Sequence, residues 1–156
     1  MRISRPQMFM DIAHVVAKRG TCQRLSVGAV LVYKRSIVSI GYNGVASGLP
    51  HCIGNHCPGK FGCDIAIHAE INAMLHLPEK TVAPLDLYVT DSPCEECWEY
   101  LIYDGRVERV FFGTPYRIDA HLMREMIGRH SPRVFRITPS GYIMDWHTKL
   151  LCEPVT

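Results

Sequence analysis

Ile67-His68-Ala69-Glu70 and Pro93-Cys94-Glu95-Glu96-Cys97 are the two stretches that decide the fold and the chemistry of this chain. Cys94 and Cys97 stand three positions apart at the expected start of a helix, so both sulfur atoms lie on one helix face. The unpaired N–H groups of a helix start favour negative charge, which suits a pair of zinc-binding thiolates. By itself, the Cys-x-x-Cys pattern also fits a redox pair or half of a zinc ribbon.

His68 and Glu70 narrow these alternatives. His-x-Glu followed by Pro-Cys-x-x-Cys is the signature of zinc deaminases, and here each half falls at an expected helix start with a strand between them. His68, Cys94 and Cys97 are the predicted zinc ligands, and three protein ligands leave the fourth position for water, as in a catalytic site. Glu70 is the predicted catalytic residue, because a carboxylate beside such a water can take its proton. The alternative is a structural zinc site with Glu70 as a helix N-terminal charge, but such sites are normally closed by a fourth protein ligand.

Alternating strand and helix patterns around these stretches predict an α/β fold with a partly parallel sheet covered on both faces. Strands are predicted over Val27–Tyr33, Ile37–Tyr42, Leu85–Thr90, Val107–Phe112 and Arg133–Thr138. Helices are predicted from the N-cap Ser4 to a stop at Gly20, over His68–Leu77, from Ser92 to about Tyr103, and over Asp119–Ile127.

Local signals indicate how these elements begin and join. Ser92-Pro93-Cys94-Glu95 predicts an N-cap, a proline at the first helical position and a capping-box glutamate. The helix that begins at His68 is apolar on most sides, so we expect it to be buried. A turn over Lys34–Ser36 joins the first two strands.

Length and composition indicate a single globular domain over residues 1–156, with a core over about residues 5–138 and a tail over residues 139–156. In the tail, Trp146, Leu150 and Leu151 are expected to pack against the core. Hydrophobic residues make up 47% and charged residues 21%, as in ordinary globular proteins. No stretch is suited to crossing a membrane or directing export, so we expect a cytoplasmic protein without a membrane partner. The formal net charge of +2 is too small to indicate a nucleic-acid partner.

In several stretches the chain resembles deoxycytidylate deaminases of the bacterial and bacteriophage type, within the cytidine deaminase-like superfamily. The resemblance is carried by Arg24–Ala29, Gly41–Gly44, Leu49–Cys52, Ile67–Ala73 and Tyr88–Cys97. It implies a three-layer α/β/α fold with a five-stranded mixed sheet flanked by helices, usually assembled as a hexamer. It also implies hydrolysis of dCMP to dUMP and ammonia, a step in the supply of dTTP. Regulation would be by dCTP as activator and dTTP as inhibitor, with Mg²⁺ on the triphosphate.

The resemblance also implies substrate contacts. Asn43 is expected to contact the deoxyribose, and Tyr116 is expected to lie on the base. Backbone groups of Ala69 and Ser92, which flank the zinc motifs, could contact the amide edge of the cytosine. Arg24 is a candidate phosphate contact. The plainer alternatives are an Asn-Gly hairpin turn, a half-buried tyrosine and an exposed arginine.

The loop Asn43–Gly48 is glycine-rich and follows a strand, so its backbone N–H groups could approach a phosphate closely. Gly44 and Gly48 are the predicted effector-binding residues, for the effectors that the resemblance implies. Val45–Gly48 has no strand pattern, and we expect a loop from Asn43 to about Asp64.

Four of the seven cysteines predict a second, structural zinc site. Seven is an odd number, and in a reducing compartment clustered cysteines more often bind metal than form disulfides. The predicted ligands are Cys22, Cys52, Cys57 and Cys63. A closed tetrahedral site could fix the long loop, although His51 or His56 could replace one cysteine. Relatives of this type carry a second metal in this region. Cys152 is left over as a packed tail residue.

Two enzyme alternatives share the expected fold. One is a tRNA adenosine deaminase, which the nearly neutral charge disfavours. The other is a deaminase of free nucleosides or other small bases, and Gly41-Tyr42-Asn43-Gly44 argues against both. The sequence also leaves open whether C5-modified dCMP is a substrate, because one methyl group in a pocket changes binding by only about 1–3 kcal/mol. The alternative outside enzymes is a zinc-stabilised interaction module, which would not need Glu70.

Overall fold

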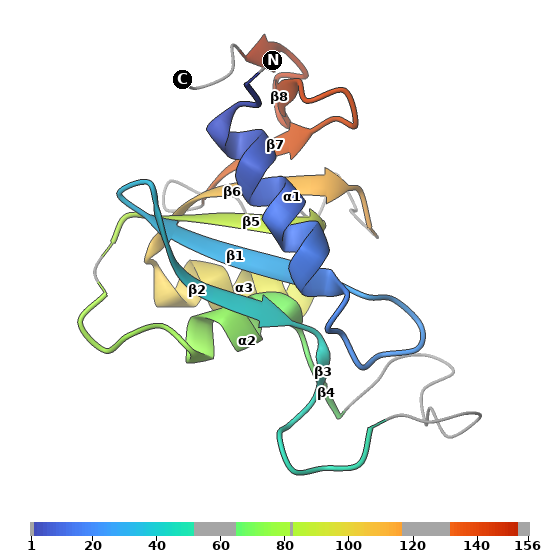
Figure 1. Ribbon diagram of the computed structural model, residues 1–156. Coiled ribbons are helices and arrows are strands. Elements are labelled where there is room, and N and C mark those ends of the chain that lie inside the picture. The colour runs from blue at the N-terminus through green and yellow to red at the C-terminus, as the bar shows by residue number, and fades with distance from the viewer. Residues whose placement is uncertain (1, 52–64, 82, 117–131, 153–156) are drawn as a thin grey trace.

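A seven-stranded mixed sheet forms the centre of the molecule in the computed structural model, which describes residues 2–51, 65–81, 83–116 and 132–152 (Figure 1). Its strands are β1 (Gly28–Tyr33), β2 (Ser36–Tyr42), β5 (Leu85–Asp91), β6 (Val107–Thr114), β7 (Arg133–Ile137), β8 (Ile143–Asp145) and β9 (Leu151–Cys152). Their order across the sheet is β2-β1-β5-β6-β7-β8-β9. β5, β6 and β7 run parallel to one another, and the remaining neighbours are antiparallel.

The tail changes the size of the sheet. The α/β class and the partly parallel sheet are confirmed, but the expected number of five strands is wrong, because the tail adds β8 and β9 at one edge. Trp146 packs edge-on against Phe112, with ring centroids 5.1 Å apart, as expected for a packed tail. Leu150 and Leu151 are each 67% exposed, so their expected burial is wrong. Strands as short as these carry too little alternation to be recognised from the sequence.

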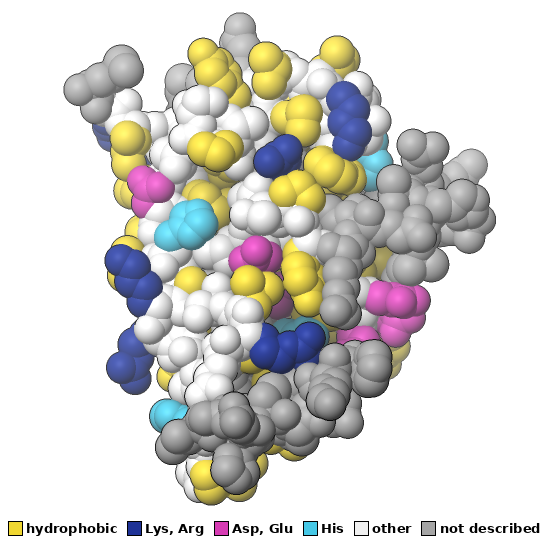
Figure 2. Space-filling view, turned by 90° about the vertical axis from the view of Figure 1, so that its right-hand side faces the viewer, with side chains coloured by type: hydrophobic (Ala, Val, Ile, Leu, Met, Phe, Trp, Pro, Cys, Tyr) yellow, Lys and Arg dark blue, Asp and Glu magenta, His cyan; other side chains and the backbone are white. Residues whose placement is uncertain are grey.

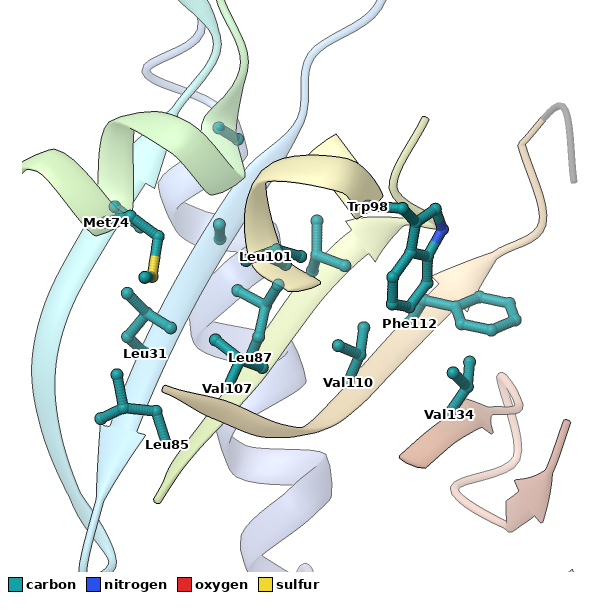
Figure 3. Packing of buried hydrophobic residues seen from close by; sticks show 14 residues of the cluster. Leu31, Met74, Leu85, Leu87, Trp98, Leu101, Val107, Val110, Phe112 and Val134 are labelled. Atoms are coloured by element: carbon teal, nitrogen blue, oxygen red, sulfur yellow. The ribbon is translucent and has the colours of Figure 1, made fainter. Parts of the chain in front are cut away.

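Helices cover both faces of the sheet, which confirms the three-layer arrangement (Figure 1). α1 (Arg5–Ala17) lies on one face, and α2 (Ala69–Leu75) and α3 (Glu95–Asp104) lie on the other. Alternate side chains of each strand therefore enter two different cores. Figure 3 shows the core under α2 and α3, in which Trp98 and Leu101 point toward the sheet residue Phe112 and its neighbours.

Two glycines on neighbouring strands let the helices lie directly on the sheet. A Cβ atom at Gly28 would overlap the carbonyl oxygen of Ala13 in α1, and one at Gly41 would overlap that of Ala69 in α2. Only a residue without a side chain fits at such a contact. Gly41 thereby fixes the start of α2, where the His-x-Glu motif lies.

The first helix and the first hairpin follow the sequence prediction closely. Ser4 caps α1, and its Oγ accepts a hydrogen bond from the backbone N–H of Gln7 at 3.3 Å. The helix ends at Ala17, three residues before Gly20. The hairpin turn consists of Lys34 and Arg35 alone, because Ser36 already pairs with Tyr33 across the strands.

α2 and α3 differ from the prediction in detail. α2 begins after the N-cap His68, and α3 begins after the N-cap Cys94 rather than after Ser92. The expectation that α2 is buried on most sides is wrong for Leu75, which is 61% exposed. Its buried residues face the sheet and α3, so only one side of α2 belongs to the core.

A small second sheet joins β3 (Gly44–Val45) to β4 (Ala66–Ile67). The expectation that the segment after Asn43 forms no strand is therefore wrong for its first two residues. The partner strand of Gly44 and Val45 lies far along the chain, so no local sequence pattern predicts the pairing. β4 leads directly into His68, and the pairing brings the Asn43 loop beside the zinc motif.

Some predicted features lie outside the described residues. These are the helix over Asp119–Ile127 and the side chains of Cys52, His56, Cys57 and Cys63. They remain predictions from the sequence. Among the helices that the structure describes, none has both the length and the apolar character needed to span a membrane.

Candidate active site

Two helix starts bring three metal-binding side chains together. His68 is the N-cap of α2, Cys94 is the N-cap of α3, and Cys97 lies in the first turn of α3. His68 Nδ1 is 3.2 Å from the Sγ atoms of both cysteines. The three donor atoms all lie within 4.8 Å of one another, and they form the one such donor cluster in the described ranges.

The donor atoms have the spacing and chemistry that zinc requires. Tetrahedral zinc with bonds of about 2.3 Å to sulfur and about 2.0 Å to nitrogen holds its ligands roughly 3.5 Å apart. Neither His68 nor Cys94 makes the side-chain hydrogen bond that an N-cap residue usually makes. Both helices therefore lack a side-chain hydrogen bond at the N-cap, and both donor atoms stay available for a metal ion.

Without a metal, the three donors share their protons unequally. A hydrogen bond from the Cys97 thiol, followed by one from His68, lowers the pKa of Cys94 to about 4. The hydrogen bond to Cys94 raises the pKa of His68 to about 9. The same thiolate, together with burial, raises the pKa of Cys97. Zinc would therefore have to displace protons from His68 and Cys97 in order to bind.

Glu70 is a buried carboxylate in the first turn of α2, with only 4% of its surface exposed. Burial raises its pKa to about 7, although hydrogen bonding to its own backbone N–H opposes the rise. A carboxyl group with a pKa near neutrality can both accept and release a proton at pH 7. Burying a carboxylate costs stability. Its position beside the metal donors indicates that this carboxylate serves proton transfer at the metal site.

A cavity of about 180 Å³, the metal-site cavity, opens beside these residues. His68, Glu70 and Cys94 line it. All five residues predicted to contact substrate line it as well, namely Arg24, Asn43, Ala69, Ser92 and Tyr116. The other lining residues are Cys22, Leu25, Val27, Ala66 and Asp91. The cavity therefore collects the predicted substrate residues around the metal donors, while the role of each stays a prediction.

Asp91 also lines this cavity, although no motif in the sequence identifies it. It is the last residue of β5, and Thr90 Oγ1 donates a hydrogen bond to Asp91 Oδ2 at 2.8 Å. The same Thr90 oxygen accepts from the backbone N–H of Gly28 at 3.2 Å. A usable signal was present, because sites in α/β folds lie beyond the carboxyl ends of strands.

Ser92 fastens the cavity wall instead of capping α3. Its Oγ accepts from the backbone N–H of Tyr116 at 2.7 Å and donates to the Tyr116 carbonyl at 2.9 Å. Its backbone N–H donates to the carbonyl of Thr114 at 2.9 Å. With the hydroxyl used in this way, the predicted N-cap at Ser92 and first helical position at Pro93 are wrong. The carboxyl ends of β5 and β6 are held together with Tyr116 at the cavity.

Asn43 holds the segment that forms another wall. It is 8% exposed, its Oδ1 accepts from the backbone N–H of Val27 at 2.8 Å, and its Nδ2 donates to the Leu25 carbonyl at 2.6 Å. Its backbone adds bonds to Val27 and Thr21. An amide side chain has a second N–H and a second lone pair, so contact with a ligand is still open to it.

The remaining predicted residues are placed as follows. Arg24 is exposed and Cys22 is half-buried, and both line the metal-site cavity. Gly44 is buried at a close approach to Thr21, where a Cβ atom would overlap the threonine hydroxyl. Gly48 is exposed, has φ of +89° and faces open space. Cys152 is half-buried at the edge strand β9.

Figure 2 views the molecule from the end toward which the carboxyl ends of β5 and β6 point. On the part of this face that the structure describes, basic and acidic side chains are scattered among hydrophobic ones. A continuous basic stripe, the usual footprint of a nucleic-acid site, is not formed by the described residues in this view.

Comparison with known proteins agrees with the site. Residues 3–114 match the family model for the cytidine and deoxycytidylate deaminase zinc-binding region. The chain is 39% identical over 120 residues to ComE operon protein 2 of Bacillus subtilis (strain 168), a match that covers 74% of this chain and 62% of that protein. It is 33% identical over 126 residues to the deoxycytidylate deaminase of Mycobacterium phage D29, which covers 70% of this chain and 97% of that one.

A solved structure of a dCMP deaminase has the same fold as this chain. The dCMP deaminase of the cyanophage S-TIM5, in complex with dCMP and dUMP, superposes with a TM-score of 0.69 at 26% identity. The match covers 83% of this chain and 94% of that chain. The chain spans less than two thirds of the Bacillus subtilis relative but nearly all of the D29 enzyme. Because the family match includes the three metal donors and Glu70, the chain belongs to the cytidine and deoxycytidylate deaminase zinc-binding family.

Proposed function

We propose that this protein is a zinc-dependent deaminase that hydrolyses dCMP to dUMP and ammonia. The observation that carries the proposal is the buried carboxylate of Glu70 in the wall of a cavity, beside His68, Cys94 and Cys97. Two relatives support dCMP as the substrate: the D29 protein is a deoxycytidylate deaminase, and the S-TIM5 enzyme was crystallised with dCMP and dUMP. A zinc-stabilised module without activity would need neither the cavity nor the buried carboxylate.

In the proposed reaction the metal ligands and Glu70 have different roles. Zinc held by His68, Cys94 and Cys97 would polarise a water molecule and lower its pKa, which supplies a nucleophile at neutral pH. Glu70 accepts a proton from the water as its oxygen bonds to C4 of the cytosine, and passes that proton to N3. Glu70 then moves the remaining hydroxyl proton to the amino nitrogen on C4, which leaves as ammonia while C4 becomes a carbonyl. The burial that raises its pKa suits both transfers.

The other lining residues would position the nucleotide. In this proposal Asn43 contacts the deoxyribose, Tyr116 covers the base, and Arg24 contacts the phosphate. Backbone groups of Ala69 and Ser92 contact the amide edge of the cytosine. The support is that all five line one cavity with Glu70, and that Ser92 and Tyr116 are bonded to each other in its wall.

An ammonia-release assay tests the substrate. The assay compares dCMP, deoxycytidine, CMP, C5-methyl-dCMP and a tRNA anticodon stem-loop at equal concentrations. We expect dCMP to exceed deoxycytidine in kcat/KM by at least about tenfold, because a hydrogen bond to a charged phosphate is worth roughly 1.5–3 kcal/mol. Equal efficiency with deoxycytidine would contradict the nucleotide assignment, and deamination of the stem-loop alone would favour the tRNA alternative.

We also propose a second, structural zinc ion. The ligands would be Cys22, Cys52, Cys57 and Cys63, with His51 or His56 as alternatives. Cys22 is a free, half-buried thiol in the wall of the metal-site cavity, so a zinc ion there would fix the cavity wall as well as the loop. Elemental analysis should find two zinc ions per chain, and Cys63→Ser should remove one and lower Tm. A wild-type content of one zinc ion per chain would contradict this proposal.

Regulation, assembly and location are proposed from the family resemblance. The protein would be a cytoplasmic hexamer that dCTP activates and dTTP inhibits, with Mg²⁺ on the triphosphate. Gly48, which is exposed and faces open space, suits effector contact, whereas the close approach to Thr21 already explains Gly44. Sedimentation equilibrium with and without dCTP and Mg²⁺ tests the assembly, and dCMP saturation curves in the same buffers test the regulation.

A further inference from the structure

A second cavity, of about 300 Å³, lies at the opposite end of the strands from the metal-site cavity. Its walls come from the first two turns of α1, the β1–β2 hairpin and the first residues of β5 and β6. This is the hairpin cavity, and it shares no lining residue with the metal-site cavity. In Figure 1 the β1–β2 hairpin lies on the left, whereas β5 and β6 end on the right, where the metal-site cavity opens.

The floor of the hairpin cavity is aromatic. Phe9 of α1 lies against Tyr88 of β5, with ring centroids 5.1 Å apart. Tyr88 in turn stacks on Phe111 of β6, with centroids 4.6 Å apart and planes within 5° of parallel. All three side chains are buried and line the cavity. Phe111 also stacks on Phe135, with centroids 4.9 Å apart, so these rings already cover one another's faces and a flat, apolar ring would meet them edge-on.

The rim of the same cavity is basic. Its charged lining residues are Arg5, Lys34, Arg35, Arg109, Asp86 and Glu108, an excess of two cations over carboxylates. Asp86 is already engaged, because both of its oxygens accept hydrogen bonds from the Arg109 guanidinium. Arg5, Lys34 and Arg35 are exposed, and no carboxylate of the described residues lies within ion-pair distance of them. The residues that line this cavity thus carry a formal charge of +2, which is as large as the formal net charge of the whole chain.

Two of these cations occupy an unfavourable turn. Lys34 has φ of 46° and Arg35 has φ of 71°, and together they form the two-residue turn between β1 and β2. Turns with positive φ at both positions strongly favour Asn-Gly. A backbone conformation that disfavours its own side chains is commonly kept where those side chains have a function. The turn holds both positive groups at the rim of the cavity.

We infer that the hairpin cavity binds a small anion that carries an aromatic ring. The ring lies against Phe9, Tyr88 and Phe111, and the anionic group is held by Arg5, Lys34 and Arg35. Charge-assisted hydrogen bonds from arginine favour a phosphate, sulfonate or carboxylate group. The inference rests on this cavity alone and does not depend on the proposed reaction.

Amide chemical shifts of the ¹⁵N-labelled protein test the inference, with 1-naphthyl phosphate as the probe. Inorganic phosphate supplies the charge without the ring, and 1-naphthol supplies the ring without the charge. We expect 1-naphthyl phosphate to shift the amides of Lys34, Arg35 and Ser36, and to bind at least about tenfold more tightly than either fragment. Shifts confined to the metal-site cavity, or no shifts at millimolar probe, would overturn the inference.

Variants of the turn separate binding from folding. The double variant K34N/R35G removes both cations and inserts the pair that the turn favours, so it should fold with an unchanged or higher Tm. We expect its Kd for 1-naphthyl phosphate to rise by at least about tenfold. K18Q/R19Q loses the same charge just after the far end of α1 and should bind like the wild type. Unchanged binding by K34N/R35G, or equal weakening in K18Q/R19Q, would overturn the inference.

Discussion

The metal-site cavity and the hairpin cavity lie at opposite ends of the same strands, and the chain builds them in different ways. The first takes its reactive groups from two helix starts, where Cys94 and Cys97 stand three positions apart on one face and His68 is followed two positions later by Glu70. The second depends on the register of β5 and β6, which places Asp86 beside Arg109 and Tyr88 beside Phe111. A spacing motif therefore reveals the first cavity, while the second becomes visible only when the register is known.

Loss of a metal donor should have the largest effect of all the variants, and it should change the metal-site cavity without changing the hairpin cavity. In Cys97→Ser a weak hydroxyl ligand replaces a thiolate, so the chain should lose the zinc ion held with His68 and Cys94, and dCMP turnover should fall to background. The loss should exceed the roughly 10²–10⁴-fold effect of a general base. Binding of 1-naphthyl phosphate at the hairpin cavity should not change. Elemental analysis, ammonia release and amide shifts measure these three outcomes.

Cys152→Ser is the matched control for that experiment. Its thiol lies at the edge strand β9 and lines neither cavity. We expect this variant to keep its zinc and its activity. Full zinc and normal turnover in Cys97→Ser would contradict the metal site.

Asn43→Ala should have the next largest effect. It removes the side-chain bonds to the half-buried Leu25 and Val27, and a hydrogen bond of this kind is worth about 0.5–1.5 kcal/mol. We expect kcat/KM for dCMP to fall about tenfold to a hundredfold, with a lower Tm and unchanged zinc at His68. Steady-state kinetics, thermal denaturation and metal analysis on one preparation give all three values.

Asn72→Ala shows whether the kinetic loss is specific. Asn72 Nδ2 donates to the Tyr42 carbonyl at 2.9 Å, a bond of the same kind, but Asn72 lines neither cavity. It should lower Tm and leave kcat/KM within about twofold of the wild type. Equal kinetic losses in the two variants would mean that Asn43 acts through stability alone.

The smallest predicted effect concerns the hairpin turn. A non-glycine residue in the left-handed region costs roughly 1–2 kcal/mol, so Arg35→Gly should be more stable than Arg35→Ala by about 1 kcal/mol. In a protein of this size that corresponds to about 2–4 °C in Tm. Both variants lose the same charge and should keep normal dCMP turnover. A higher Tm for Arg35→Ala would show that the turn is not strained.

The sequence predicts the parts of the site that depend on local pattern. The helix that begins at His68, the strand that follows it and the place of Glu70 beside the metal donors follow from motifs a few residues long, whereas α3 begins two residues later than its local pattern predicts. Long-range contacts are not predictable in this way. Ser92 has the local pattern of an N-cap, but its hydroxyl bonds to Tyr116, which lies far along the chain.

The fold shows the same division. The strands with strong apolar runs are found, whereas β8 and β9 depend on antiparallel pairing with the edge of the sheet and are too short to show alternation. Gly44 and Val45 likewise form a strand only because Ala66 and Ile67 return beside them. Pairing partners that are remote in sequence decide each of these cases.

The most direct test of the central claim compares Glu70→Gln with the wild type, using dUMP formation from dCMP and zinc content in the same samples. Glutamine has the shape of glutamate but cannot take the proton from water, so kcat should fall by about 10²–10⁴-fold with zinc unchanged. Glu99→Gln, an exposed glutamate of α3 outside both cavities, should retain normal turnover. If Glu70→Gln kept more than about a tenth of the wild-type rate, Glu70 would not be the proton carrier and the proposed mechanism would be wrong.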